Sequence, residues 1–170
     1  MLTGGLKWGE MVHCGIFWGL MDNWDTGFFV GEFRHSLDAK GRLTIPASWR
    51  IQSTGKRDAF LALPNPDGYI TVYGPEMIAQ LRERIAKIGM ADIEAQRALA
   101  QTMAKAQSFS VDKQGRINLN SQLLQHSGIE KDAVLLGKIT SFSIFNAAAY
   151  DAQASSDNVS LSQALARFGL

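Results

Sequence analysis

Two short stretches of the sequence carry the same residue types at the same spacing, and those types can do chemistry on a turn. "LDAKGRL" begins at Leu37 and "VDKQGRI" begins at Val111, 74 residues later. Each stretch places an aspartate four residues before an arginine, with a glycine in between. The arginine can bind a guanine edge or a phosphate, because its planar fork donates two parallel hydrogen bonds. It can equally pair with the aspartate of its own turn, and the spacing leaves both alternatives open.

The residues around each stretch predict a strand, a turn and a second strand. Apolar residues alternate before each aspartate, which is the two-residue period of a strand. Aspartate bonds to backbone amides about two residues further on, and glycine adopts a positive φ without steric cost. We therefore expect each repeat to open with a hairpin. Its structural turn residues are Asp38 and Gly41 in the first copy, and Asp112, Gly115 and Arg116 in the second.

Each repeat then predicts a short helix and two more strands. Pro46 and Asn120 suit the start of the two helices, and Gly55 and Gly128 suit their ends. The stretches "DAFLALPNPDGYITVYG" and "DAVLLGKITSFSIFN" both follow the pattern of paired strands. A unit of about 45 residues is too small to bury a full core alone. The two repeats are therefore expected to pack together as one pseudo-twofold domain.

The segment between the repeats, 75–106, predicts a helical hairpin. Pro75 can open a helix, Gly89 breaks it, and Asp92 can cap a second, alanine-rich helix. The first helix carries an apolar stripe that could cover the core or meet another subunit, formed by Met77, Ile78, Leu81, Ile85 and Ile88.

The two ends of the chain show weaker patterns. Residues 1–27 form an N-terminal extension without clean periodicity, which we expect to be poorly ordered. In the C-terminal tail, 151–170, we expect a loop followed by a short terminal helix. The two repeats themselves are expected to occupy residues 28–74 and 107–150.

Composition and charge exclude several classes of protein. The chain has 170 residues, 46% of them apolar, so it can build a core. Its single cysteine, Cys14, excludes an intrachain disulfide framework and a cysteine-based zinc site. The most apolar early stretch, Met11–Met21, is too short to span a bilayer. The net charge is only +1, but Arg34 to Arg57 holds six basic residues against Asp38 alone. This local excess suits an anionic partner, or a solvated surface.

Enzymatic and metal-binding functions find no support in the motifs. There is no Ser/His/Asp order, no pair of carboxylates in a recognisable frame and no phosphate-cradling glycine loop. The histidines His13, His35 and His126 are scattered and are expected to be structural. We expect no enzymatic activity, no metal, no cofactor and no small-molecule substrate.

The string "GEFRHSLDAKGRLTIPASWR", with the second copy "VDKQGRI", resembles the bacterial MraZ family. The resemblance covers about Phe28 to Tyr150. It implies an α+β, β-rich fold made of two tandem SpoVT/AbrB-type swapped-hairpin units, forming a pseudo-twofold barrel with an inserted helical hairpin. It further implies a DNA-binding transcriptional regulator that acts in the cytoplasm, at the nucleoid. Members of the family bind short G-rich direct repeats, control the division and cell wall gene cluster that includes their own gene, and assemble into rings, often octameric.

The resemblance also implies which residues contact double-stranded DNA. These DNA-binding residues are Lys40, Arg42 and Arg50, and Arg34, at the start of the basic stretch, is expected to join them. The sequence departs from the family in its second copy, where Leu124 replaces a common arginine and Asn120 stands in the position of Pro46. The first copy is therefore expected to face DNA, and the second to serve mainly as its packing partner.

Two other functions remain as alternatives. An AbrB-like antitoxin would combine one hairpin unit with a disordered tail that binds a toxin, but here a second unit occupies that position. A structural ring scaffold without specific DNA binding would leave the basic residues of the first turn without a purpose.

Overall fold

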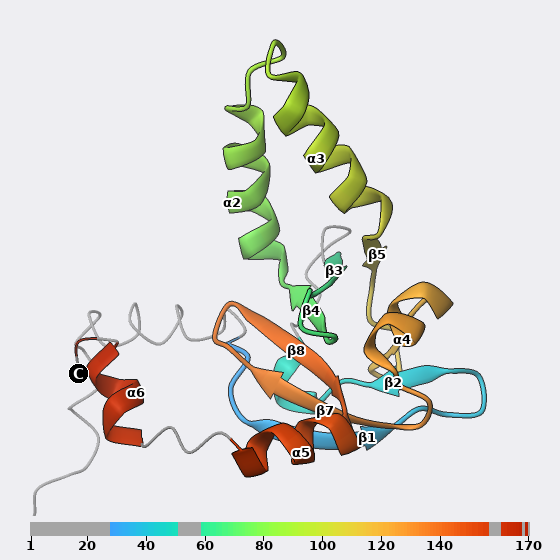
Figure 1. Ribbon diagram of the computed structural model, residues 1–170. Helices are drawn as coiled ribbons and strands as arrows, with labels where there is room; N and C mark the ends of the chain where they lie inside the picture. Colours follow the sequence, from blue (N-terminus) through green and yellow to red (C-terminus); the bar gives the residue numbers. More distant parts are fainter. Residues whose placement is uncertain (1–27, 51–58, 157–160, 168, 170) are drawn as a thin grey trace, which may run out of the picture.

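The computed structural model describes residues 28–50, 59–156, 161–167 and 169 (Figure 1). The expectations for residues 1–27 and for Gly55 lie outside these ranges. The described chain is an α+β protein with antiparallel sheets, as the sequence predicts. Its eight strands are β1 (Glu32–Ser36), β2 (Arg42–Thr44), β3 (Phe60–Pro64), β4 (Ile70–Tyr73), β5 (Gln107–Phe109), β6 (Arg116–Asn118), β7 (Asp132–Gly137) and β8 (Ser141–Asn146).

The strands pair across the two repeats. Six of them form one sheet in the order β1-β7-β8-β4-β3-β5, and β2 and β6 form a separate two-stranded sheet. The first strand of each repeat pairs with the third strand of the other, β1 with β7 and β5 with β3. The second strands pair with each other, and so do the fourth strands. Exchanging the two repeats therefore leaves the pairing pattern unchanged.

This exchange corrects the expectation that each repeat opens with a hairpin. The turn itself closes, because the Asp38 amide donates to the Arg42 carbonyl oxygen over 2.9 Å. The strands on either side of it nevertheless pair with β7 and β6 instead of with each other. Pairing between repeats brings the apolar faces of both units into one core, which neither small unit could build alone.

The core is a single cluster that draws on both repeats. Trp49 is 1% exposed and packs edge-on against Phe29, with ring centroids 5.7 Å apart. Its indole Nε1 donates to the Val30 carbonyl oxygen over 3.0 Å, so its one polar group is satisfied. Leu43 of β2 and Ile117 of β6 lie opposite each other and are buried in the same cluster. These two buried side chains anchor the two-stranded sheet, which follows the turns, to the core.

Short helices follow the two turns. In the first repeat Pro46 precedes a single 3₁₀ turn, η1 (Ala47–Trp49). In the second, α4 (Ser121–Ser127) is capped by Asn120, whose side chain accepts from the Leu123 amide over 2.8 Å. Gly128 ends α4 with a φ of 63°. The predicted cap at Asn120 and the predicted end at Gly128 are both confirmed.

The predicted helical hairpin is confirmed as α2 (Pro75–Ala86) and α3 (Ile93–Ala104). Asp92 caps α3 by accepting from the Ala95 amide over 3.0 Å. Figure 1 shows the hairpin projecting away from the sheets, and neither helix has a buried residue. We call residues 75–104 the arm.

Two helices follow the second repeat, α5 (Ala147–Ser156) and α6 (Leu161–Arg167). The expected loop after position 151 is wrong as far as Ser156, because α5 continues through it. Asn146 accepts from the Ala149 amide over 3.1 Å at the start of this alanine-rich helix. The expected terminal helix is confirmed as α6. No helix in the described part of the chain is both long and apolar enough to cross a membrane.

Candidate nucleic-acid interface

The first turn, 38–41, is organised by the carboxylate of Asp38. Oδ1 accepts from the backbone amides of Lys40 and Arg42, over 2.8 and 2.9 Å. Oδ2 accepts from the Nε of Arg42 and also lies 2.7 Å from its Nη2. These bonds favour the charged carboxylate, the Arg42 amide most of all, and lower the pKa of Asp38 to about 2. Aspartate and arginine thus hold one rigid turn.

The second turn, 112–115, repeats this geometry. Asp112 Oδ1 accepts from the amides of Gln114 and Arg116, over 2.9 and 2.8 Å. Its Oδ2 accepts from Arg116 Nε over 3.0 Å, and the amide bond from Arg116 is the main cause of a lowered Asp112 pKa. The ion pair within the turn, one of the two alternatives that the sequence left open, is therefore present in both copies. The ion pair in the first turn leaves one nitrogen of the guanidinium available, because Arg42 Nη1 has no partner among the described residues.

The two turns differ in what covers their glycines. Gly41 (φ +72°) has open space where a side chain would begin. Gly115 (φ +79°) is buried, and a Cβ there would overlap the guanidinium of Arg50. Arg50 belongs to the first repeat, and its Nε donates to the Ile45 carbonyl oxygen over 3.1 Å. Arg50 therefore closes the second turn, whereas the first turn stays open.

The contact of Arg50 with the second turn was missed by the sequence reasoning, although a signal for it exists. The first repeat has Arg50 where the second has Leu124, and Leu124 packs partly buried against the core. An aliphatic side chain that turns inward leaves the opposite glycine uncovered. This difference is the local reason for the open space over Gly41.

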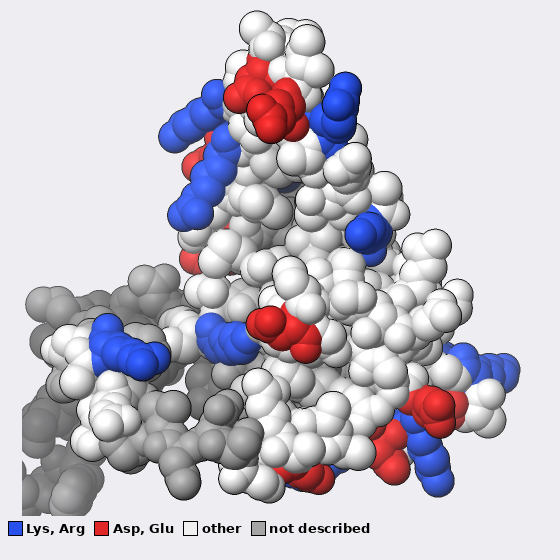
Figure 2. All heavy atoms as spheres, in the orientation of Figure 1, with Lys and Arg blue, Asp and Glu red and all other residues white. Residues whose placement is uncertain are grey.

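The two turns carry the same charges, one aspartate, one lysine and one arginine each, and differ in the position of the lysine. Lys40 is exposed, and within the described ranges its ammonium forms no ion pair; Gln114 is the matching residue on the second turn. Lys113 is exposed one position earlier. Figure 2 shows basic and acidic side chains interspersed on this face, including its lower right, where the turn between β1 and β2 lies. The face carries separate cations instead of one continuous basic patch.

Arg34 lies apart from the turns. It is on β1, and its guanidinium pairs with both carboxylate oxygens of Asp151 on α5, over 2.7 and 3.1 Å. Arg34 Nη2 also lies 3.3 Å from Glu32 Oε1, and the Tyr150 ring centroid is 6.0 Å from Arg34 Cζ. The hydrogen bond to Asp151 is the main cause of a raised Arg34 pKa. The charge of Arg34 is thus matched within the chain, by a residue too distant in sequence to be anticipated.

The two described histidines serve packing and a backbone contact. His35 is half-buried on β1, and burial, with a smaller effect of the nearby Arg50 charge, lowers its pKa. His126 Nε2 lies 2.6 Å from the Asn65 carbonyl oxygen. No group of histidine, cysteine or acidic residues in the described ranges could hold a metal ion.

The fold and the turns define a class: an α+β protein of two interlocked repeats, each carrying an Asp–Arg turn. A family model described as "MraZ protein, putative antitoxin-like" matches residues 102–169. "Transcriptional regulator MraZ" of Natranaerobius thermophilus is 38% identical over 109 residues, covering 64% of this chain and 74% of the relative.

Two further relatives bear the same name. That of Chlorobium phaeobacteroides is 33% identical and covers 66% of this chain and 78% of its own length. That of Lachnoclostridium phytofermentans is 31% identical and covers 84% and 98%. The chain belongs to the MraZ family, as the resemblance of its turn motifs indicates.

Proposed function

We propose that this chain is a transcriptional regulator that binds specific double-stranded DNA through the turn between β1 and β2. The naming of its relatives as transcriptional regulators supports this function. The observation that carries the site is the position of Lys40, an exposed cation without an ion pair in the described ranges, on a turn fixed by Asp38.

The first turn is suited to DNA because it is ordered before it binds. Lys40 can contact a phosphate as a point charge. Arg42 is held by Asp38 through Nε and Nη2 and keeps Nη1 available for a base edge or a phosphate. A side chain that is already held loses less conformational freedom on binding, so more of the interaction energy contributes to affinity.

The second repeat serves mainly to hold the first in place. Its turn carries Gln114 where the first carries Lys40, and Arg50 covers Gly115. Arg50 adds a positive charge beside the second turn, whereas Arg34 contributes little because Asp151 compensates its charge. The DNA-facing residues are thus Lys40 and Arg42, with Arg50 as a secondary contact.

The pairing of strands between repeats supports two swapped-hairpin units, residues 28–74 and 107–150, forming one pseudo-twofold barrel with the arm inserted. The regulator represses or tunes the division and cell wall gene cluster, its own gene included, by binding short G-rich direct repeats at the nucleoid. Several copies in a ring, eight in the common family arrangement, bring weak sites together and raise affinity by avidity.

The experiment compares Arg42→Ala with Arg116→Ala in anisotropy titrations on DNA upstream of the chain's own gene and on scrambled DNA. Each substitution removes the ion pair between the arginine and the aspartate of its own turn, so Arg116→Ala is a matched control for loss of turn structure. Arg42→Ala is expected to cost about 1–3 kcal/mol of specific binding, and Arg116→Ala much less. Equal losses would contradict the assignment to the first turn.

The family description "antitoxin-like" is the observation that favours a second candidate, an antitoxin that binds a protein toxin. The same titration separates the two. An antitoxin without its own DNA function, or a ring scaffold, would bind upstream and scrambled DNA with equal, weak affinity.

A further inference from the structure

The tip of the arm exposes more apolar surface than a solvated loop needs. Met90, in the connection between α2 and α3, is 95% exposed, and Ile93 in the first turn of α3 is 70% exposed. Single exposed apolar residues are ordinary, but these two lie three residues apart at the end of a projecting element. Glu94 is exposed beside them. The arm tip therefore presents an apolar knob with an acidic edge.

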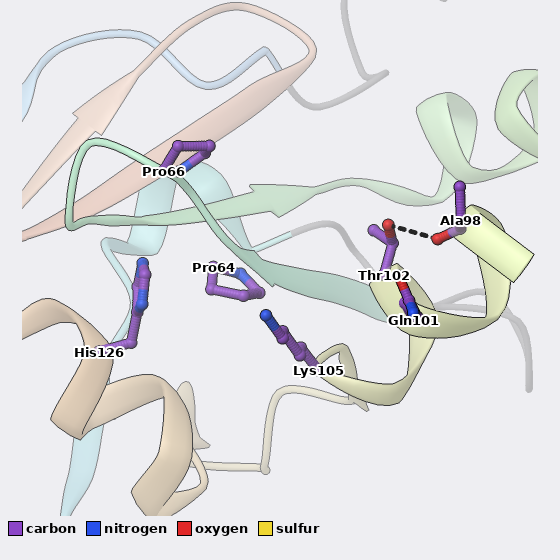
Figure 3. A pocket seen from close by; sticks show the side chains of 7 residues that line it. All are labelled: Pro64, Pro66, Ala98, Gln101, Thr102, Lys105 and His126. Atoms are coloured by element: carbon purple, nitrogen blue, oxygen red, sulfur yellow. Dashed lines mark hydrogen bonds between the residues drawn. The ribbon is translucent and has the colours of Figure 1, made fainter.

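A pocket of about 580 Å³ lies at the other end of the arm. We call it the foot pocket; it is lined by Pro64, Pro66, Ala98, Gln101, Thr102, Lys105 and His126. Figure 3 shows Pro64, the last residue of β3, between His126 and Lys105, with Lys105 extending toward it and Pro66 further along the β3–β4 connection. None of the described residues that line the pocket is acidic. The foot pocket thus combines an apolar part, formed by the two prolines and Ala98, with polar side chains that include the cation of Lys105.

The arm tip cannot enter the foot pocket of its own chain. Met90 precedes α3 and Lys105 follows it, and a helix of 12 residues separates them by about 18 Å along its axis. A tip that fills a foot pocket therefore belongs to another copy. The pocket volume lies within the ~300–1,000 Å³ that is typical of pockets for small-molecule ligands, so it has room for one or two side chains of a partner.

We propose that the arm tip of one copy docks in the foot pocket of a second copy. Met90 and Ile93 pack against Pro64 and Pro66, and Glu94 faces Lys105. The apolar side chains of the tip then contact the apolar part of the pocket, and the carboxylate of Glu94 meets the ammonium of Lys105, so the two surfaces complement each other. The contact joins different patches on the two copies, which is the kind of interface that closes into rings. The inference rests on the self-assembly included in the proposed function and assigns it an interface.

Disulfide cross-linking tests the contact between copies. In a Cys14→Ser background, protein carrying Met90→Cys is mixed with protein carrying Thr102→Cys and oxidised. A disulfide-linked heterodimer is expected in severalfold excess over a control in which Ala39→Cys, on the exposed first turn, replaces Met90→Cys. Equal yields in the two mixtures would overturn the proposal.

Charge exchange gives an independent measure through light scattering of the chromatographed protein. Glu94→Lys or Lys105→Glu alone is expected to raise the concentration needed for assembly roughly fivefold or more, and the double variant to restore it. Both positions are exposed, and matching thermal melts exclude misfolding. Unchanged assembly in both single variants would place the interface elsewhere and leave the DNA proposal intact. A wild-type chain that stays monomeric would overturn the self-assembly itself.

Discussion

Substituting the two turn glycines by alanine should have unequal effects on stability, although both have a positive φ. Gly41→Ala adds a Cβ in open space, so it costs only the strain of the left-handed backbone, about 1–2 kcal/mol. Gly115→Ala carries the same strain and also displaces the guanidinium of Arg50. The guanidinium is the end of a flexible side chain and can swing away, but its bond to the Ile45 carbonyl oxygen is then lost. That loss adds about 1 kcal/mol.

Urea denaturation at one fixed protein concentration measures both free energies of unfolding. Repeating both substitutions in an Arg50→Ala background completes a double-mutant cycle. With Arg50 absent, the two alanine variants should be destabilised equally, which gives a coupling of about 1 kcal/mol between Gly115 and Arg50. Equal costs in the wild-type background, or an excess for Gly115→Ala that survives without Arg50, would refute the asymmetry of the turns.

Three further predictions concern acid stability and charge. The pKa of Asp38 is lowered to about 2, so the charged carboxylate stabilises the fold fully above about pH 4, and this stabilisation is lost as the pH falls toward 2. Asp38→Asn should flatten this part of the curve of unfolding free energy against pH, measured by urea denaturation. Burial lowers the pKa of His35, because the folded state disfavours the charged imidazole. The free energy of unfolding should therefore decline as the pH falls below about 6.5, and His35→Gln should remove this decline. Arg34→Ala should change DNA affinity less than twofold and instead speed hydrogen exchange in α5, because it removes the pair with Asp151; a large loss of affinity would return Arg34 to the DNA-facing set.

The turns and caps follow from local chemistry, which is why the sequence predicts them. Asp38 accepts from a backbone amide two residues further on, and Gly41 adopts a positive φ. Both roles depend only on the four residues of the turn, so the local sequence is enough to predict them. Asp92 and Asn120 stand directly before helical patterns and cap them as expected. The start of α5 had a comparable signal in Asn146 before three alanines, but the polar residues that follow obscured it.

Strand partners and ion pairs between distant elements could not be predicted in this way. Alternation of apolar residues shows that β1 is a strand with one inward face, but it does not say that β7, about 100 residues later, is its neighbour. The pair of Arg34 with Asp151 depends on the same long-range arrangement. The basic excess of the first repeat was therefore a fair indicator of net charge and a poor indicator of which cations remain available.

The central claim, that the first turn reads DNA, is tested most directly by the salt dependence of binding for Lys40→Gln beside Lys113→Gln. Both lysines are exposed on corresponding turns and neither forms an ion pair in the described part of the chain, so neither change should disturb folding. Anisotropy titrations on upstream DNA at several salt concentrations should show weaker binding for Lys40→Gln, with a salt slope reduced by about one per contacting copy. Lys113→Gln should match the wild type. Equal losses for the two variants, or no loss for Lys40→Gln, would contradict the claim.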